Sequence, residues 1–89
     1  MTKRVRERVE VVDTLPDRRA NDGAPSRFRW KGRIYRVRSI LGFWREDTGP
    51  WWRHGLEVPQ RDLWRVDTSL GIIELVHERG EWRVTRVWD

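Results

Sequence analysis

Apolar and charged residues alternate along much of the chain, with the spacing of β-strands that bury one face. Segment 2–12 places valines between charged side chains, and segment 27–38 places aromatic and aliphatic side chains between arginines. Successive side chains of a strand point to opposite faces. Each segment is therefore predicted to form a strand with one apolar face and one charged face. For segment 2–12 a helical arm is the alternative, and the valines favour the strand.

Glycine-containing turns separate the apolar runs at hairpin spacing. Lys31-Gly32 and Arg79-Gly80 predict tight turns, and Ser69-Leu70-Gly71 predicts a third. The strands predicted after the first of these turns are Ile34–Arg45, Leu63–Asp67, Ile72–His77 and Glu81–Asp89. No segment carries the apolar stripe of a long helix. The fold is thus predicted to be mainly β, a small antiparallel meander of five to six strands curled into an open barrel or roll.

The same alternation selects the side chains that face the core. Leu41 and Phe43 are expected to continue the buried face of Tyr35 and Val37. The later strands are expected to bury Trp64, Val66, Ile73, Leu75, Trp82 and Val84. Five tryptophans are assigned to packing in the core or at its rim: Trp30, Trp44, Trp64, Trp82 and Trp88.

A change of composition divides the chain near residue 26. Residues 13–26 are rich in Pro, Gly, Asn and Asp and offer few side chains to bury, which is typical of linkers. Residues 1–26 are therefore predicted to form a flexible N-terminal arm and mobile linker, and residues 27–89 the compact β domain. The length of 89 residues allows one small core, in which seven tryptophans offset a hydrophobic fraction of 37%.

Positive charge is concentrated in one part of the chain. The formal net charge is +5, yet residues 27–45 carry seven positive charges and no acid, so the other residues sum to −2. Seventeen arginines against two lysines is a skew that a GC-rich genome also produces, so the clustering is more informative than the total. Arginines interleaved with aromatic rings suit a surface that binds phosphates and stacks bases. They equally suit the charged face of an ordinary amphipathic strand pair.

The first candidate site is this basic hairpin. Alternation places most of its cations on one solvent face, and the residues predicted to contact nucleic-acid phosphates are Arg27, Arg29, Lys31, Arg33, Arg36 and Arg38. The alternative is a solvated outer face whose charges prevent edge-to-edge pairing of sheets.

The second candidate lies in Glu46–Pro59, which is predicted to be a long loop. It contains Trp51, Trp52 and Arg53 in sequence. Neighbouring residues of an extended segment point opposite ways, so one tryptophan is expected inside and one outside. An exposed ring beside Arg53 suits base stacking or a protein partner. The alternative is a loop that folds over the barrel end, with both rings in the core.

Catalysis is not expected. The chain has no cysteine, its two histidines (His54 and His77) lie in unrelated contexts, and its glycines are scattered singly. No spacing matches a metal-ligand pattern, so neither a metal nor a cofactor is predicted, and no small-molecule substrate is evident. No apolar run approaches about 20 residues, and the first residues lack the apolar core of a signal peptide. A soluble, cytoplasmic protein that does not bind membranes is expected.

These residues resemble a family of short uncharacterised actinobacterial proteins. The resemblance is carried by an Arg-Phe-x-Trp-x-Gly-x-x-Tyr-x-Val segment, a Trp-Arg-Glu…Gly-Pro-Trp-Trp-Arg stretch and a closing Trp-Arg-Val-x-Arg-Val-Trp-Asp. The matching segments are Arg27–Val37, Trp44–Arg53, Leu63–Val66, Ile73–Leu75 and Trp82–Asp89. A similar order occurs in the C-terminal tail of ImuB, the catalytically dead Y-family polymerase relative of the bacterial mutasome, where a Tyr often stands in place of Trp88. Neither resemblance covers the N-terminal arm.

The resemblance implies an accessory role near DNA-damage tolerance and transfers no catalytic residue. Together with the basic hairpin it leads to one main expectation: a nonenzymatic small β module that binds nucleic acid, or a DNA-associated protein complex. The alternative is a protein-interaction adaptor that uses the Trp51-Trp52 loop or a sheet edge.

Overall fold

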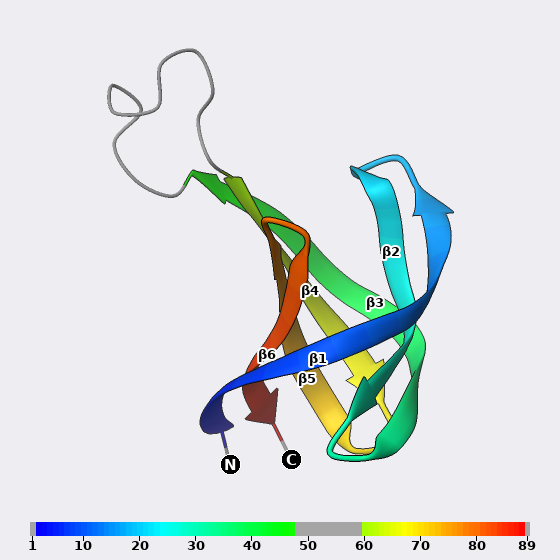
Figure 1. The fold of residues 1–89 in the computed structure, drawn as a ribbon, viewed down its shortest axis with the longest axis vertical. Coiled ribbons are helices and arrows are strands. Elements are labelled where there is room, and N and C mark those ends of the chain that lie inside the picture. Colours follow the sequence, from blue (N-terminus) through cyan, green and yellow to red (C-terminus); the bar gives the residue numbers. More distant parts are fainter. Residues whose placement is uncertain (1, 48–59, 89) are drawn as a thin grey trace.

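The computed structural model describes residues 2–47 and 60–88, and these form six antiparallel strands (Figure 1). The strands are β1 (Thr2–Asp17), β2 (Ala20–Trp30), β3 (Arg33–Asp47), β4 (Gln60–Thr68), β5 (Gly71–Glu78) and β6 (Glu81–Trp88). They close into a barrel in chain order, with β1 beside β6. The all-β prediction is confirmed, and the barrel is closed, where an open barrel or roll was expected. Residues 2–47 and 60–88 include no helix with the length and apolarity needed to cross a membrane.

Closure depends on β1, which crosses the molecule as one long strand (Figure 1). Its first half pairs with β6 from Thr2 to Val9, and its second half pairs with β2 from Glu10 to Asp17. Val9 belongs to the buried core. The structure therefore corrects the prediction of an N-terminal arm: residues 2–26 form β1 and the first part of β2, and they are not separated from residues 27–88.

The Pro and Gly residues that indicated a linker lie at irregularities of the β1–β2 ladder. Pro25 pairs with Thr14 and is fully buried, and the register shifts three times along the ladder. Gly23 has a φ of +83°, and a Cβ there would lie 2.6 Å from the carbonyl oxygen of Leu15. Bulges and close backbone approaches select the same residue types as linkers do. Composition alone does not distinguish the two.

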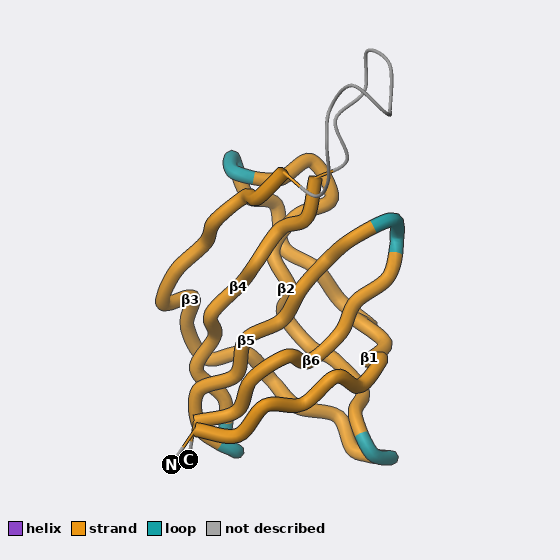
Figure 2. Tube along the Cα trace, turned by 90° about the vertical axis from the view of Figure 1, so that its left-hand side faces the viewer, coloured by secondary structure: helices purple, strands orange, loops and turns teal. Residues whose placement is uncertain are grey.

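Two hairpins have the turns that the sequence predicts. Lys31 and Gly32 have φ values of 52° and 76°, and Arg79 and Gly80 have 52° and 77°. Positive φ at both central residues defines the type I′ turn, whose twist matches that of the flanking strands. The turns joining β2 to β3 and β5 to β6 lie at opposite ends of the barrel (Figure 2).

The core is built from the inward faces of the strands. Its fully buried side chains include Phe28, Trp64, Val66, Ile73, Leu75 and Val84. Phe43 lies against Trp64 with 4.5 Å between ring centroids, and Phe28 stacks on Tyr35 at 5.6 Å. These assignments confirm the alternation of the sequence, and the aromatic rings fill much of a small interior.

The middle of β3 departs from simple alternation. Along the β3–β4 ladder, Val37 and Ser39 face consecutive residues of β4, and so do Ile40 and Gly42, which leaves Arg38 and Leu41 as bulged residues. Each bulge reverses the inward and outward positions that follow it. Ile40 therefore packs against the core while Leu41 is 51% exposed, contrary to the prediction for Leu41, and the second bulge returns Phe43 to the inside.

Candidate nucleic-acid interface

The six predicted phosphate contacts are all exposed and lie along the β2–β3 hairpin. Arg27 lies directly opposite Arg36, and Arg29 lies opposite Ile34, so these residues share the outer face. Arg33 lies opposite Trp30, beside the turn, and Arg38 is the bulged residue further along β3. The hairpin thus brings the predicted cations together at one end of the barrel.

The cations of β2 and the turn are compensated by acids of β1. Arg27 hydrogen-bonds the carboxylate of Asp13, which is its partner in the β1–β2 register. Arg29 Nη1 lies 3.6 Å from Glu10 Oε2, again its register partner. Two of the six predicted cations are therefore paired with acids of the neighbouring strand.

Lys31 in the turn is compensated in a different way. Its Nζ lies 4.0 Å from Glu7 Oε1 and 4.8 Å from the centroid of the Trp30 ring. Glu7 also accepts a hydrogen bond of 2.6 Å from Trp30 Nε1. Lys31 is thus part of the packing that holds the edge of Trp30 at this end of the barrel.

The three predicted cations on β3 lack such partners. Arg33, Arg36 and Arg38 are exposed and make no ion pair, side-chain hydrogen bond or ring contact within residues 2–47 and 60–88. The acids of β1 that could approach the hairpin already bind cations of β2 and the turn. The uncompensated positive charge of the hairpin therefore lies on β3.

Large apolar side chains accompany this charge on β3. Ile34 is 52% exposed, Leu41 is 51% exposed and Trp44 is 39% exposed. A protein surface carries many apolar atoms, but three large side chains on the outer face of one strand form a specific feature. The β3 strip, which consists of Arg33, Ile34, Arg36, Arg38, Leu41 and Trp44, joins cations to apolar surface. Arg33 is the cross-strand partner of buried Trp30, so it marks the turn end of the strip and does not share the outer face of Ile34 and Arg36.

The ring of Trp44 is fixed by its neighbours. It lies over Gly42, where a Cβ would come within 3.1 Å of the ring. The guanidinium of Arg65 lies 4.9 Å from the ring centroid of Trp44 and 4.9 Å from that of Trp88. A cation between two aromatic faces restrains both rings, so Trp44 presents a held, partly exposed aromatic surface.

Two other arginines are used to close the far end of the barrel. Arg19 lies over the rings of Phe43 and Trp64, at 5.7 and 5.4 Å from their centroids. Its hydrogen bonds lower the pKa of Asp17 from 3.8 to about 2, and the same hydrogen bonds raise the pKa of Arg19. Arg45 hydrogen-bonds Asp62 at 2.8 Å, which raises the pKa of Arg45. Arg19 and Arg45 therefore already have carboxylate partners within the barrel.

The other residues considered in the sequence are those of the Trp51-Trp52 loop and the two histidines. Trp51, Trp52, Arg53 and His54 lie outside the described residues. His77 stacks on Trp82 with ring centroids 4.1 Å apart, and its Nδ1 lies 3.8 Å from Asp22. Residues 2–47 and 60–88 hold no group of three or more side chains suited to a metal ion.

A family model described as "Domain of unknown function (DUF6504)" matches residues 1–89. The chain belongs to this family. The match includes residues 1–26, which the resemblance to short proteins and to the ImuB tail leaves out, and this agrees with the place of β1 and β2 in the barrel. The expectation of a small domain family without an assigned activity is confirmed. No curated protein and no solved structure matches the chain.

Sequence reasoning missed Trp44 as a surface residue and missed the division of the cations into two groups. Gly42, two positions before Trp44, is a signal for the first, since a residue without a side chain leaves room for a ring on the surface. The division has no local signal, because it depends on which acids of β1 lie beside β2.

Proposed function

We propose that this domain is a nonenzymatic module that binds nucleic acid through the β3 strip. The observation that carries the proposal is the uncompensated charge of Arg33, Arg36 and Arg38 on the same strand as the held ring of Trp44. Guanidinium groups without a carboxylate partner are available to phosphates, and an aromatic face is available to a base.

The arrangement favours a single strand as the ligand. Arg36 and Trp44 are eight positions apart on one strand, and the two bulges between them leave a distance of roughly 20 Å at the usual rise of an extended chain. Several nucleotides of a single strand span such a length, with phosphates on the arginines and an unstacked base on Trp44. The bases of a duplex are stacked on each other and offer no free face to this ring.

The resemblance to the ImuB tail and to short actinobacterial proteins adds a biological setting to this proposal. An accessory role in DNA-damage tolerance, in the cytoplasm, brings such a domain to single-stranded DNA or to the proteins bound there. This setting is an analogy that rests on sequence pattern, and the binding itself is argued from the β3 strip alone.

The test is fluorescence anisotropy with labelled single-stranded and double-stranded DNA, titrated across salt concentrations. The Arg36→Glu/Arg38→Glu variant is expected to reduce the slope of log K against log salt by about 1.5 or more, since each lost phosphate contact on a single strand is worth about 0.7. Trp44→Ala is expected to weaken single-strand binding by about tenfold, at about 1–3 kcal/mol per stacked base, while Trp44→Phe retains most of it.

The matched control is Arg18→Glu/Arg79→Glu. Both residues are exposed and lie in turns outside the β3 strip, and the variant changes the net charge by the same amount. Equal losses in the two double variants would show binding that depends only on net charge. Absence of binding at low salt would reject the proposal altogether.

A protein-interaction adaptor is the second candidate, and two observations favour it. Ile34, Leu41 and Trp44 are exposed on β3. In addition, β3 pairs with β2 only up to Arg36, and within the described strands residues 37–47 have β4 as their single partner. A peptide strand could add at that side. Such docking tolerates salt, which distinguishes it from nucleic-acid binding.

A further inference from the structure

A second concentration of arginines lines a hollow of about 400 Å³ on the outer face of β4, β5, β6 and β1. Five arginines contribute to its walls: Arg4, Arg6, Arg61, Arg83 and Arg86. It lies on different strands from the β3 strip. The hollow was not indicated by the sequence, where these arginines are dispersed over more than 80 positions.

Two of the five arginines already have carboxylate partners at the rim. Arg61 Nη2 lies 2.7 Å from Glu46 Oε2, and Arg83 Nη2 lies 3.0 Å from Glu81 Oε2. The other three, Arg4, Arg6 and Arg86, make no ion pair within residues 2–47 and 60–88. The uncompensated charge of the hollow therefore comes from β1 and β6.

The acid nearest to these arginines in the register is Glu74, which forms no ion pair with any of them. Glu74 lies between Arg65 of β4 and Arg86 of β6 in the ladders. It is buried and accepts a hydrogen bond of 2.9 Å from Thr85 Oγ1, and Arg65 is directed to the rings of Trp44 and Trp88. Glu74 thus forms part of the floor and leaves the guanidinium of Arg86 without an ion pair.

The register places like charges directly opposite each other at this site. Arg4 is the cross-strand partner of Arg86. Two cations in such a pair repel each other and reduce stability, and an anion held between them removes that cost. Irregularities lie beside the pair: Thr85 is an extra residue relative to β5, and β1 has an extra residue between Arg4 and Glu7. Bulges bend strands, in keeping with the hollow shape of the surface at this point.

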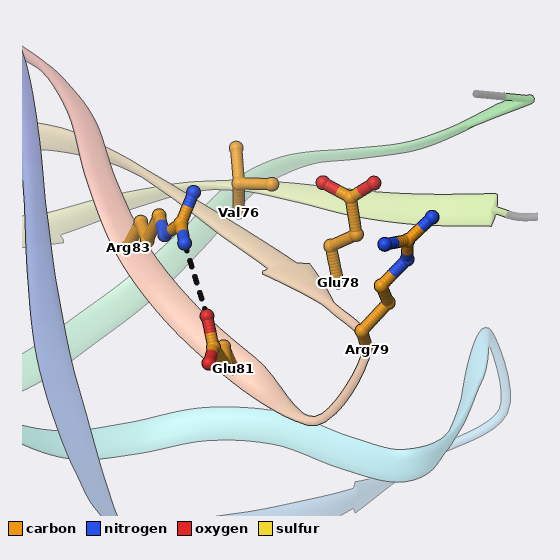
Figure 3. Close-up of a pocket in the computed structure, with 5 residues that line it drawn as sticks. All are labelled: Val76, Glu78, Arg79, Glu81 and Arg83. Carbon is orange, nitrogen blue, oxygen red and sulfur yellow. Dashed lines mark hydrogen bonds and ion pairs between the residues drawn. The ribbon is translucent and has the colours of Figure 1, made fainter. Parts of the chain in front are cut away.

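An adjacent hollow of about 280 Å³ gives an internal comparison (Figure 3). It shares Glu78 and Arg83 with the larger one and is completed by Arg79 and Glu81. Its two acids balance its two arginines, and Figure 3 shows Arg83 directed at Glu81. The smaller hollow therefore has no excess positive charge to attract an anion. The larger hollow has five arginines and only two acids, Glu74 and Glu78.

We infer that the larger hollow binds a phosphate group, held between Arg4, Arg6 and Arg86. Guanidinium groups bind phosphate oxygens through paired, charge-assisted hydrogen bonds. The volume admits a pyrophosphate or the phosphates of a nucleotide. The phosphate belongs either to a free phosphoester or to a nucleic-acid backbone, and both sources present the same oxygens to these side chains.

The experiment follows backbone amide signals of the ¹⁵N-labelled full chain by NMR at constant ionic strength. Sodium pyrophosphate is added to one sample and an oligothymidylate to another. Pyrophosphate is expected to shift the amides of residues 4–6 and 83–86 and to leave those of residues 33–38 in place. The Arg4→Gln/Arg86→Gln variant is expected to weaken this binding by at least about tenfold, because two charge-assisted contacts are lost.

The control variant is Arg18→Gln/Arg79→Gln, which removes the same charge outside the larger hollow. The proposal is overturned if pyrophosphate shifts no amide, or if both double variants weaken binding equally. Shifts of residues 4–6 and 83–86 by oligothymidylate, lost in Arg4→Gln/Arg86→Gln, would assign the site to a nucleic-acid backbone. Shifts by pyrophosphate alone would assign it to a free phosphoester.

The proposed phosphate site is independent of the proposed nucleic-acid binding by the β3 strip. Failure of DNA to bind the β3 strip leaves the pyrophosphate titration unchanged, since the two sites share no residue. Replacing Arg4 and Arg86 removes a repulsive pair, so the variant is expected to stay folded. A thermal melt of the variant at or above the parent midpoint is the expected check.

Discussion

Both strands of the basic hairpin carry exposed arginines, but those on β2 have carboxylate partners and those on β3 have none in the described chain. Arg27 and Arg29 on β2 face carboxylates of β1, whereas Arg36 and Arg38 on β3 face no acid in the described chain. The strands are adjacent and joined by a tight turn. The difference arises only because β1 pairs with β2 and not with β3.

This comparison shows that a run of basic residues does not measure the charge available to a ligand. A cation that forms an ion pair with its register-matched acid loses most of its attraction for phosphate, because the acid repels the same phosphate that the cation attracts. The charge that remains free is set by the strand order of the barrel. Three predictions test this view, from the largest expected effect to the smallest.

The fragment 27–89 is expected to lose cooperative folding entirely. It lacks β1 and most of β2, so it lacks Val9, Ala20 and Ala24 from the core and leaves β6 without a partner on one side. Circular dichroism during heating measures the transition. The intact chain carrying Val9→Ala is the control, and it is expected to unfold cooperatively with a loss of about 1–3 kcal/mol.

A cooperative transition in the fragment would contradict the role of β1 in closing the barrel. It would restore residues 27–89 as a domain that folds alone and residues 1–26 as an appended arm. The acids of β1 would then be dispensable neighbours of β2 rather than fixed parts of the barrel.

Neutralising the β1 acids is expected to strengthen DNA binding. In the Glu10→Gln/Asp13→Asn variant, Arg27 and Arg29 lose their carboxylate partners and become available, as Arg36 and Arg38 already are. The salt slope on a single strand is expected to steepen by about 1.4, at about 0.7 for each added phosphate contact. Anisotropy across salt concentrations measures the change.

The matched control for this gain is Asp22→Asn/Asp67→Asn. It removes two negative charges from acids that pair with no arginine in the described chain. If the control steepens the slope equally, the gain reflects overall charge, and the distinction between β2 and β3 has no consequence for binding.

The smallest effect concerns a single ion pair at the tip of the β1–β2 hairpin. Arg19 lowers the pKa of Asp17 from 3.8 to about 2. A carboxyl group with a lowered folded-state pKa contributes stability that is present above its unfolded pKa and is lost as pH falls through its folded pKa. Stability is therefore expected to fall between about pH 4 and pH 2.

Asp17→Asn removes this titrating group, so the variant is expected to be less stable at pH 5 and to lose less stability on acidification. Thermal midpoints at pH 5, 4, 3 and 2 measure both effects. Parallel acid curves for the parent and the variant would show that the Asp17–Arg19 pair adds nothing to the pH dependence of folding.

The sequence by itself determined most of the strands, three of the turns and most of the core. Alternation over 27–38 and the pairs Lys31-Gly32 and Arg79-Gly80 are local patterns, and the strand period of two residues and the positive φ of type I′ turns are local physical constraints. Phe28, Trp64 and Leu75 could be assigned to the core for that reason.

Only the tertiary structure decided which strands meet, where the bulges lie and which charges remain free. The pairing of β1 with both β6 and β2 brings together residues up to 86 positions apart, as Thr2 and Trp88 are. The bulges at Arg38 and Leu41 appear only in the register of β3 against β4. Non-local register leaves no local pattern in the chain, so the β3 strip and the arginine-lined hollow emerge only when the barrel closes.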